Sequence, residues 1–263
     1  MKKIFTSPLF TPVIFTILWS ALIAVVLIYF PEQKFAITED GKVLDIITNV
    51  GYILMIATML LLANDYRDKT TSWGIFLFLG IAAFLREGGI QHHLSKTDTT
   101  PFKSRFFLNP DNPIAEKIVF GLIILVLFGA LAYLAIKYTK HLITSFFKLN
   151  PITWTTAVFC TVLICAKFAD RYPSNWRKAH DDTLLPREQI EIWSLLEESL
   201  EMFLPYLVII MMLQYHVLLQ NKKATLKKIA SDNSASKTAE KVAKKPVKKV
   251  SAKKTVKKAI KKK

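Results

Sequence analysis

The sequence is poor in cysteine, and it lacks the glycine-rich motifs of several large enzyme classes. Its two cysteines, Cys160 and Cys165, are five residues apart in one apolar run, which on a helix turns them about 140° away from each other. This spacing argues against a disulfide or a shared metal, and we expect both to be buried apolar side chains. The sequence contains no Gly-x-Ser-x-Gly elbow and no glycine-rich phosphate loop, which argues against the enzymes built on those motifs.

Charge is absent from six long stretches of the sequence. The uncharged stretches are residues 4–31, 46–64, 70–85, 118–136, 149–166 and 202–221. About 20 apolar residues span a bilayer, and a backbone in lipid must satisfy its own hydrogen bonds, so these stretches predict transmembrane helices. We predict helices over about 10–30, 46–64, 70–86, 118–137, 150–168 and 196–220. The third stretch is the shortest and contains Gly74 and Gly80, so a buried or re-entrant segment is the alternative there.

The predicted fold class is therefore all-α: a polytopic membrane helix bundle over residues 1–220. The formal net charge of +16 does not belong to this bundle. Residues 221–263 contain 17 lysines against Asp232 and Glu240 only, whereas the rest of the chain has 19 basic and 18 acidic residues. A segment of this composition cannot bury a core, so we expect 221–263 to be a disordered, lysine-rich tail.

The end of the tail has a recognisable composition. From Lys244 it reads KKPVKKVSAKKTVKKAIKKK. It resembles the Lys/Ala-rich tails of histone-H1-like and related bacterial proteins, over about residues 222–263 and in composition only. So many lysines beside a membrane helix favour anionic lipid or nucleic acid as a partner. The tail has no aromatic residue and no arginine, so we expect it to bind without reading a base sequence.

Six helices would place both ends of the chain on one side of the membrane. The lysine-rich tail, with Lys2 and Lys3 at the other end, favours the cytoplasmic side of an inner (plasma) membrane. The first run is then an uncleaved signal anchor. Two long loops, about 86–117 and 167–201, would face outward although each has five basic residues, more than the short inward loops.

Ionisable residues gather at the ends of three predicted helices. They are Arg86 and Glu87 after the third helix, Lys167, Asp170 and Arg171 after the fifth, and Glu197, Glu198 and Glu201 before the sixth. These ends lie on the same side of the membrane in a six-helix topology, so the clusters predict one polar site. Carboxylates near an apolar bundle suit acid/base or ligand roles, and we choose Glu87, Asp170, Glu198 and Glu201 as candidates. Arg86 and Arg171 are candidate substrate-binding cations. The alternative is that these charges form ion pairs that fix helix packing.

The first long loop brings cations close to aromatic residues. Lys103 and Arg105 stand beside Phe106 and Phe107, just before a membrane helix. Such a pair could bind a lipid phosphate, or it could be an interfacial belt. The dipeptides Asn109-Pro110 and Asn150-Pro151 predict helix starts, with asparagine as the cap and proline in the first turn.

Histidine gives a weak indication of a divalent metal. His92 and His180 fall in the two long loops, and with a carboxylate they have the chemistry to hold zinc or a similar ion. Their spacing matches no metal motif. His141 and His216 fall at the opposite side, and we interpret them as interfacial or packing residues.

Two classes of function stay open. The first is a membrane enzyme that acts on a lipid or lipid-linked substrate through the polar site. The second is a scaffold or small transporter whose basic tail binds nucleic acid or anionic lipid. The uncharged cores of helices one, two, four and five count against a path for a charged substrate through the midplane.

Overall fold

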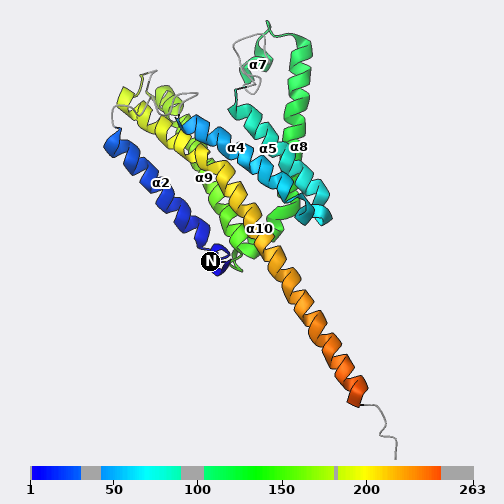
Figure 1. Ribbon diagram of the computed structural model, residues 1–263. Coiled ribbons are helices and arrows are strands. Elements are labelled where there is room, and N and C mark those ends of the chain that lie inside the picture. Colours follow the sequence, from blue (N-terminus) through cyan, green and yellow to red (C-terminus); the bar gives the residue numbers. More distant parts are fainter. Residues whose placement is uncertain (1, 31–42, 90–103, 181–182, 244–263) are drawn as a thin grey trace, which may run out of the picture. The chain divides into compact units, whose positions relative to one another are not determined.

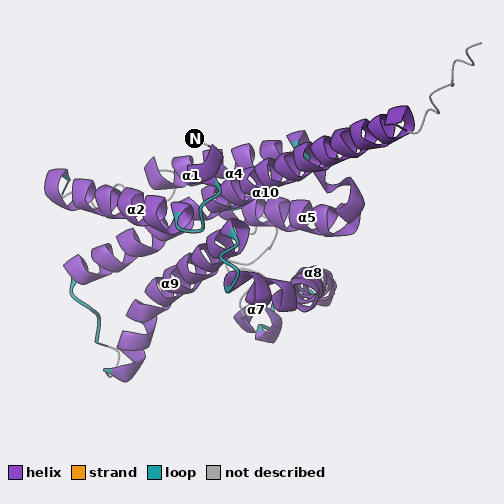
Figure 2. Ribbon diagram, turned by 90° about the horizontal axis from the view of Figure 1, so that it is seen from below, coloured by secondary structure: helices purple, strands orange, loops and turns teal. Residues whose placement is uncertain are grey.

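The computed structural model describes residues 2–30, 43–89, 104–180 and 183–243. The side chains at 2–3, 67–68, 104–105 and 230–243 lie outside this description. All regular structure in the described residues is helical (Figure 2). The chain divides into two compact units, Met1–Leu219 and Gln220–Lys263, which we call the bundle and the tail unit.

Six long helices and several short ones build the described chain (Figure 1). In order they are α1 (Lys2–Phe5), α2 (Phe10–Tyr29), α4 (Val43–Leu61), the 3-10 helix η1 (Ala63–Lys69), α5 (Thr70–Glu87), α7 (Ser104–Leu108), α8 (Ile114–Phe146), α9 (Pro151–Ala179) and α10 (Arg187–Ala243). Of the described helices, α2, α4, α8, α9 and the Arg187–Ile229 part of α10 are long and apolar enough to cross a membrane. The chain is a helical membrane protein.

The remaining predicted span, α5, is not among those five helices. Its 18 residues begin with Thr70, Thr71 and Ser72 and end with Arg86 and Glu87, so its apolar part is short. It nevertheless packs along α4: the Trp73 indole donates to the Met59 carbonyl at 3.3 Å near one end, and the rings of Phe84 and Tyr52 meet at 6.5 Å near the other. An 18-residue helix is about 27 Å long, close to the thickness of a bilayer core.

Three helices are longer than the sequence predicted. Helix α8 continues nine residues past the predicted end to Phe146, α9 runs to Ala179 and α10 begins at Arg187. An uncharged run marks only the part of a helix that lies in lipid. Charged residues that extend the helix beyond it meet water and headgroups, where they cost little.

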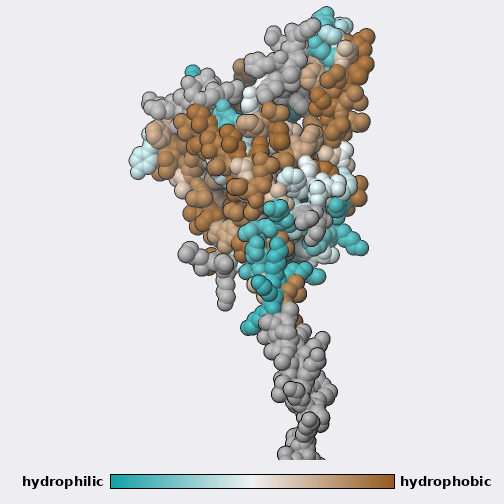
Figure 3. Space-filling view, turned by 45° about the vertical axis from the view of Figure 1, so that its right-hand side comes forward, coloured by the Kyte–Doolittle hydropathy of each residue, from teal (hydrophilic) through white to brown (hydrophobic). Residues whose placement is uncertain are grey.

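The bundle has two buried apolar clusters. One joins α9 and α10 through Val162, Ala166, Leu200, Leu204 and Leu207, with Phe15 and Trp19 of α2 packed against it. The other joins α2, α4 and α10 through Val26, Leu44, Leu195 and Met202. Much of the remaining apolar surface is exposed, as expected for a bundle in lipid, and hydrophobic residues cover much of the face seen in Figure 3.

Buried hydrogen bonds tie α2, α9 and α10 together at the end of the bundle where α1 lies. Thr11, Thr155 and Gln214 are each completely buried. The hydroxyls of Thr11 and Thr155 are 2.6 Å apart, Thr155 donates to Gln214 Oε1 at 2.8 Å, and Gln214 Nε2 donates to Thr11 Oγ1 at 3.3 Å. We call these three residues the polar ring, because each accepts from one member and donates to the next.

Two local predictions have different outcomes. Asn150 caps α9, because its side-chain oxygen accepts from the Ile152 amide at 3.0 Å and Pro151 occupies the first turn. The same prediction for Asn109-Pro110 is wrong: α8 begins only at Ile114, and Asn109 instead closes a turn by accepting from the Asp111 amide.

The cysteines also differ from expectation. Both Cys160 and Cys165 are free thiols, and both are exposed on α9 rather than buried. An apolar residue of a membrane helix can face lipid, so apolar character alone does not place it in the protein interior.

In the tail unit, α10 is helical to Ala243, whereas the sequence predicted disorder from residue 221. Residues 221–243 are rich in lysine and alanine, which have high helix propensity, and residues 221–229 are exposed. The predicted disorder of 244–263 lies outside the described residues.

Candidate functional site

Charged residues from α5, α9 and α10 converge at the end of the bundle opposite α1. The Glu197 carboxylate interacts electrostatically with Asp170 and Glu201, which repel it, and with Lys167 and Arg86, which attract it. These residues come from three helix ends that sequence reasoning placed on one side. We call Arg86, Glu87, Lys167, Asp170, Arg171, Glu197 and Glu201 the charged cluster.

On α9, one carboxylate is held between two cations of its own helix. Lys167 Nζ lies 2.5 Å from Asp170 Oδ2, and Arg171 Nε lies 3.7 Å from the same oxygen. All three side chains are at least one third exposed, so each pair contributes at most about 1 kcal/mol to stability. The arrangement instead fixes two cationic groups side by side at the edge of the bundle.

On α10, three carboxylates are partly shielded from solvent. Glu197, Glu198 and Glu201 are all half-buried, and Glu197 and Glu201 are one helical turn apart. Like charges this close raise each other's energy unless cations or protons offset them. Arg86 and Lys167 are cations that lie near enough to attract Glu197 electrostatically.

A buried tyrosine lies beside the cluster. Tyr52 on α4 is only 9% exposed, and it interacts electrostatically with Glu87, Glu201 and Arg86. Its hydroxyl can both donate and accept a hydrogen bond. Sequence reasoning missed Tyr52, because it lies inside an uncharged run with nothing to distinguish it from a packing residue. Glu197 was visible in the sequence but was not among the chosen candidates.

Close helix packing sets the position of Tyr52. A Cβ atom on Gly51 would lie 2.8 Å from both Pro205 Cγ and Tyr206 Cε2, so α4 and α10 approach each other where glycine leaves room. A Cβ atom on Gly80 would lie 2.8 Å from Met55 Cε, whereas one on Gly74 would meet nothing. The Tyr206 hydroxyl donates to the Ile47 carbonyl at 2.9 Å and holds the same two helices.

Two prolines leave backbone carbonyls near the cluster without their helical donors. Pro205 lies inside α10 and Pro173 inside α9. Proline has no backbone N–H, so the carbonyls of Glu201 and Ala169, four residues earlier, lose their usual helical donors. Both carbonyls belong to residues in or next to the charged cluster, and they can accept from a ligand or from water.

Of the other predicted site residues, His180 contacts a neighbour on α9. The His180 ring stacks on Trp176 at 3.8 Å, and its Nδ1 lies 3.0 Å from the Trp176 carbonyl. Within the described residues, no three His, Cys, Asp or Glu side chains are grouped as a metal site would require. His92 and Lys103 lie outside the described residues, and so does the Arg105 side chain. The metal hypothesis stays a prediction.

A second polar group lies on η1 and α10. His216 Nδ1 pairs with Asp65 Oδ2, the rings of Tyr66 and Tyr215 stack at 4.8 Å, and Lys69 Nζ lies over the Tyr215 ring. Burial, more than the neighbouring Tyr215 and Asp65, raises the pKa of Tyr66. Sequence reasoning interpreted His216 as an interfacial or packing residue, because its partner is 151 residues away in the chain.

Comparison with known proteins identifies no matching family model, no similar curated protein and no similar solved structure.

Proposed function

We propose that this chain is a multi-pass inner-membrane protein whose charged cluster acts on a lipid or lipid-linked substrate at the non-cytoplasmic face. One arrangement carries the proposal: charged groups of α5, of α9 and of its own helix α10 lie near enough to Glu197 to act on it electrostatically, at one end of an apolar bundle. A surface charge that only snorkels to headgroups does not need partners from three helices.

The cationic and the anionic residues of the cluster are suited to different roles. Arg86, Lys167 and Arg171 are suited to bind a phosphate or another anionic headgroup. Glu197 and Glu201, half-buried and close together, are suited to accept a proton from the attacking hydroxyl or water. The Tyr52 hydroxyl can donate a hydrogen bond to a carboxylate of the cluster. Glu87 and Glu198 stay candidates for the same role, and Asp170 positions the two cations of α9.

The test is turnover by the full-length protein in vesicles that contain phospholipids and a polyprenyl phosphate, with products identified by mass spectrometry. We expect Glu197→Gln to lower the rate about 100-fold or more, because acid/base groups typically contribute that much. Glu188→Gln is the matched control, since Glu188 is an exposed carboxylate on the same helix. A product formed equally by both variants, or by neither variant nor the parent, would exclude this role for the cluster.

The orientation rests on two groups of basic residues. The lysine-rich segment after residue 220 is one. The other is the α8–α9 connection, where Lys137, Lys140 and Lys148 have no carboxylate near them in the sequence. Basic residues near membrane helices favour the cytoplasm, so both groups support the same orientation, with both ends of the chain inside.

A second function belongs to the tail unit. We propose that it binds polyanions, either anionic lipid or nucleic acid, because 17 lysines face only two acidic residues between 221 and 263. This binding does not depend on the charged cluster. It makes the protein a membrane attachment point for its ligand.

Deletion of the chain after Gln220 tests the tail. We expect the truncated protein to lose retention of RNA and to keep the thermal stability of the full chain. Binding by the full chain should fall steeply between 50 and 200 mM salt, because lysine-phosphate contacts release counterions. Retention that persists after truncation, or that ignores salt, would assign polyanion binding to another part of the chain.

A further inference from the structure

The hairpin formed by α8 and α9 has an unusual distribution of charge. Between Glu116 and Asp170 the sequence contains no carboxylate. Lysines at positions 137, 140 and 148 lie near the connection between the two helices, and Lys140 and Lys148 are exposed. Lys137 is already engaged by Ser72 Oγ at 2.8 Å and Tyr133 Oη at 2.9 Å. This end of the hairpin therefore has two exposed cations that no acid of the hairpin neutralises.

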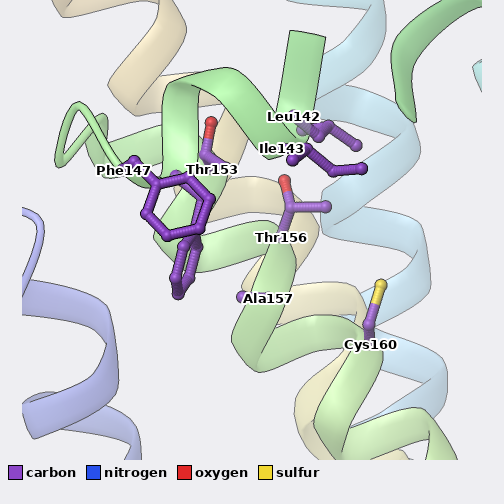
Figure 4. Close-up of a pocket in the computed structure, with 8 residues that line it drawn as sticks. Leu142, Ile143, Phe147, Thr153, Thr156, Ala157 and Cys160 are labelled. Carbon is purple, nitrogen blue, oxygen red and sulfur yellow. The ribbon is translucent and has the colours of Figure 1, made fainter. Parts of the chain in front are cut away.

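The same end of the hairpin contains an apolar groove between the two helices. Its walls include Ile143, Phe146 and Phe147 from the α8 side and Thr156, Ala157 and Cys160 from α9 (Figure 4). The groove has a volume of about 350 Å³. Phe147 is 80% exposed, so part of the wall is open to the surroundings.

The groove offers a ligand almost no polar group. The Thr156 hydroxyl donates to the Ile152 carbonyl at 2.8 Å and also contacts the Met211 sulfur at 3.2 Å, so its hydrogen-bonding capacity is used inside the bundle. The occupant must therefore be apolar where it lies in the groove. In a membrane protein, the apolar molecule at hand is a lipid acyl chain.

The dimensions and the rim suit one lipid. Cys160 is ten residues beyond Asn150, or about 15 Å along α9, which is about half the thickness of a bilayer core. Lys140 is three residues before Ile143 and so lies on a neighbouring face of α8, and Lys148 follows Phe147 directly. A chain in the groove thus has its headgroup near exposed cations with no carboxylate beside them in the sequence.

We propose that the α8–α9 groove binds an anionic phospholipid of the bilayer, with an acyl chain against Phe147, Ala157 and Cys160 and the phosphate at Lys140 and Lys148. Basic pockets between membrane helices recognise anionic headgroups in this way. The site is separate from the charged cluster, which lies at the other end of α9, and it does not depend on the proposed function of that cluster.

Photo-crosslinking tests the proposal with the full-length protein in phosphatidylcholine vesicles. The probes are phosphatidylglycerol and phosphatidylcholine with the same diazirine in the acyl chain, and mass spectrometry locates the crosslinks. We expect the phosphatidylglycerol probe to label the groove residues far more than the phosphatidylcholine probe does. Lys140→Gln and Lys148→Gln should each lower this preference about fivefold. Lys117→Gln, at the other end of α8, controls for general attraction to the basic chain.

A second pair of variants tests the groove itself. Cys160→Phe fills the groove and should abolish its labelling, whereas Cys165→Phe, on another face of the same helix, should leave it unchanged. Both cysteines are exposed, so both variants should elute as folded protein. Equal labelling by the two probes, or labelling that survives Cys160→Phe, would overturn the proposal.

Discussion

The polar ring of Thr11, Thr155 and Gln214 makes a quantitative test of what holds the bundle together. Thr155→Val removes the donor to Gln214 Oε1 and the acceptor for Thr11, and it leaves both partners completely buried. An unsatisfied buried polar group costs about 1–3 kcal/mol, so we expect a loss of stability in that range. Gln214→Leu should cost less, because the two threonine hydroxyls can still pair with each other.

The double variant Thr155→Val/Gln214→Leu separates pairing from packing. With both groups gone, no carboxamide oxygen is left without a donor, so the double variant should lose less stability than the sum of the two single variants. We expect a coupling energy of about 1 kcal/mol, within the range measured for hydrogen bonds between membrane helices. The assay is equilibrium unfolding of the full-length protein in mixed micelles with increasing dodecyl sulfate.

Thr156→Val is the matched control for this cycle. Its hydroxyl bonds within its own helix and contacts a sulfur, and it lies outside the polar ring. Its coupling to Gln214→Leu should be zero within about 0.5 kcal/mol, the usual limit for independent sites. The reasoning fails if Thr155→Val and Thr156→Val cost the same, or if the Thr155–Gln214 coupling is also zero.

Helix packing and the second polar group give further predictions for the same unfolding assay. Gly51→Ala should cost about 1–3 kcal/mol through overpacking, Gly80→Ala less because it meets only the flexible end of a methionine, and Gly74→Ala should be neutral or stabilising by up to about 1 kcal/mol. The opposite order would mean that α4 does not approach its neighbours through glycine. His216→Phe removes the pairing with Asp65 and should cost about 0.5–1.5 kcal/mol, so a stabilised variant would show that the pair is dispensable.

Helix positions and the convergence of charge followed from the sequence because both depend on coarse features. An uncharged run of sufficient length predicts a membrane helix, and the alternation of helices decides which ends share a face. The ends of α8, α9 and α10 could not be predicted in this way, because their terminal turns contain charged residues that are helical but lie beyond the apolar run.

The sequence did not indicate how each helix is rotated about its own axis. The pairing of His216 with Asp65, and the position of Tyr52 beside the charged cluster, depend on which face of a helix meets which neighbour. A soluble protein reveals this through its apolar stripe, but a helix in lipid can be apolar on all sides. For the same reason, Cys160 and Cys165 were expected in the interior although they face outward.

The contact between Gly51 and Pro205 affects how the charged cluster can move. Proline lets α10 bend at this point, and Gly51 of α4 has no side chain to block a small change in the angle of α10. The segment before Pro205 then acts as a lever: Glu197 lies about 12 Å from Pro205 along the helix, so a change of about 10° in its angle shifts Glu197 by about 2 Å. Glu197 lies on this lever, whereas Arg86 and Lys167 lie on other helices. The angle of α10 at Pro205 therefore contributes to the separation between the Glu197 carboxylate and these cations.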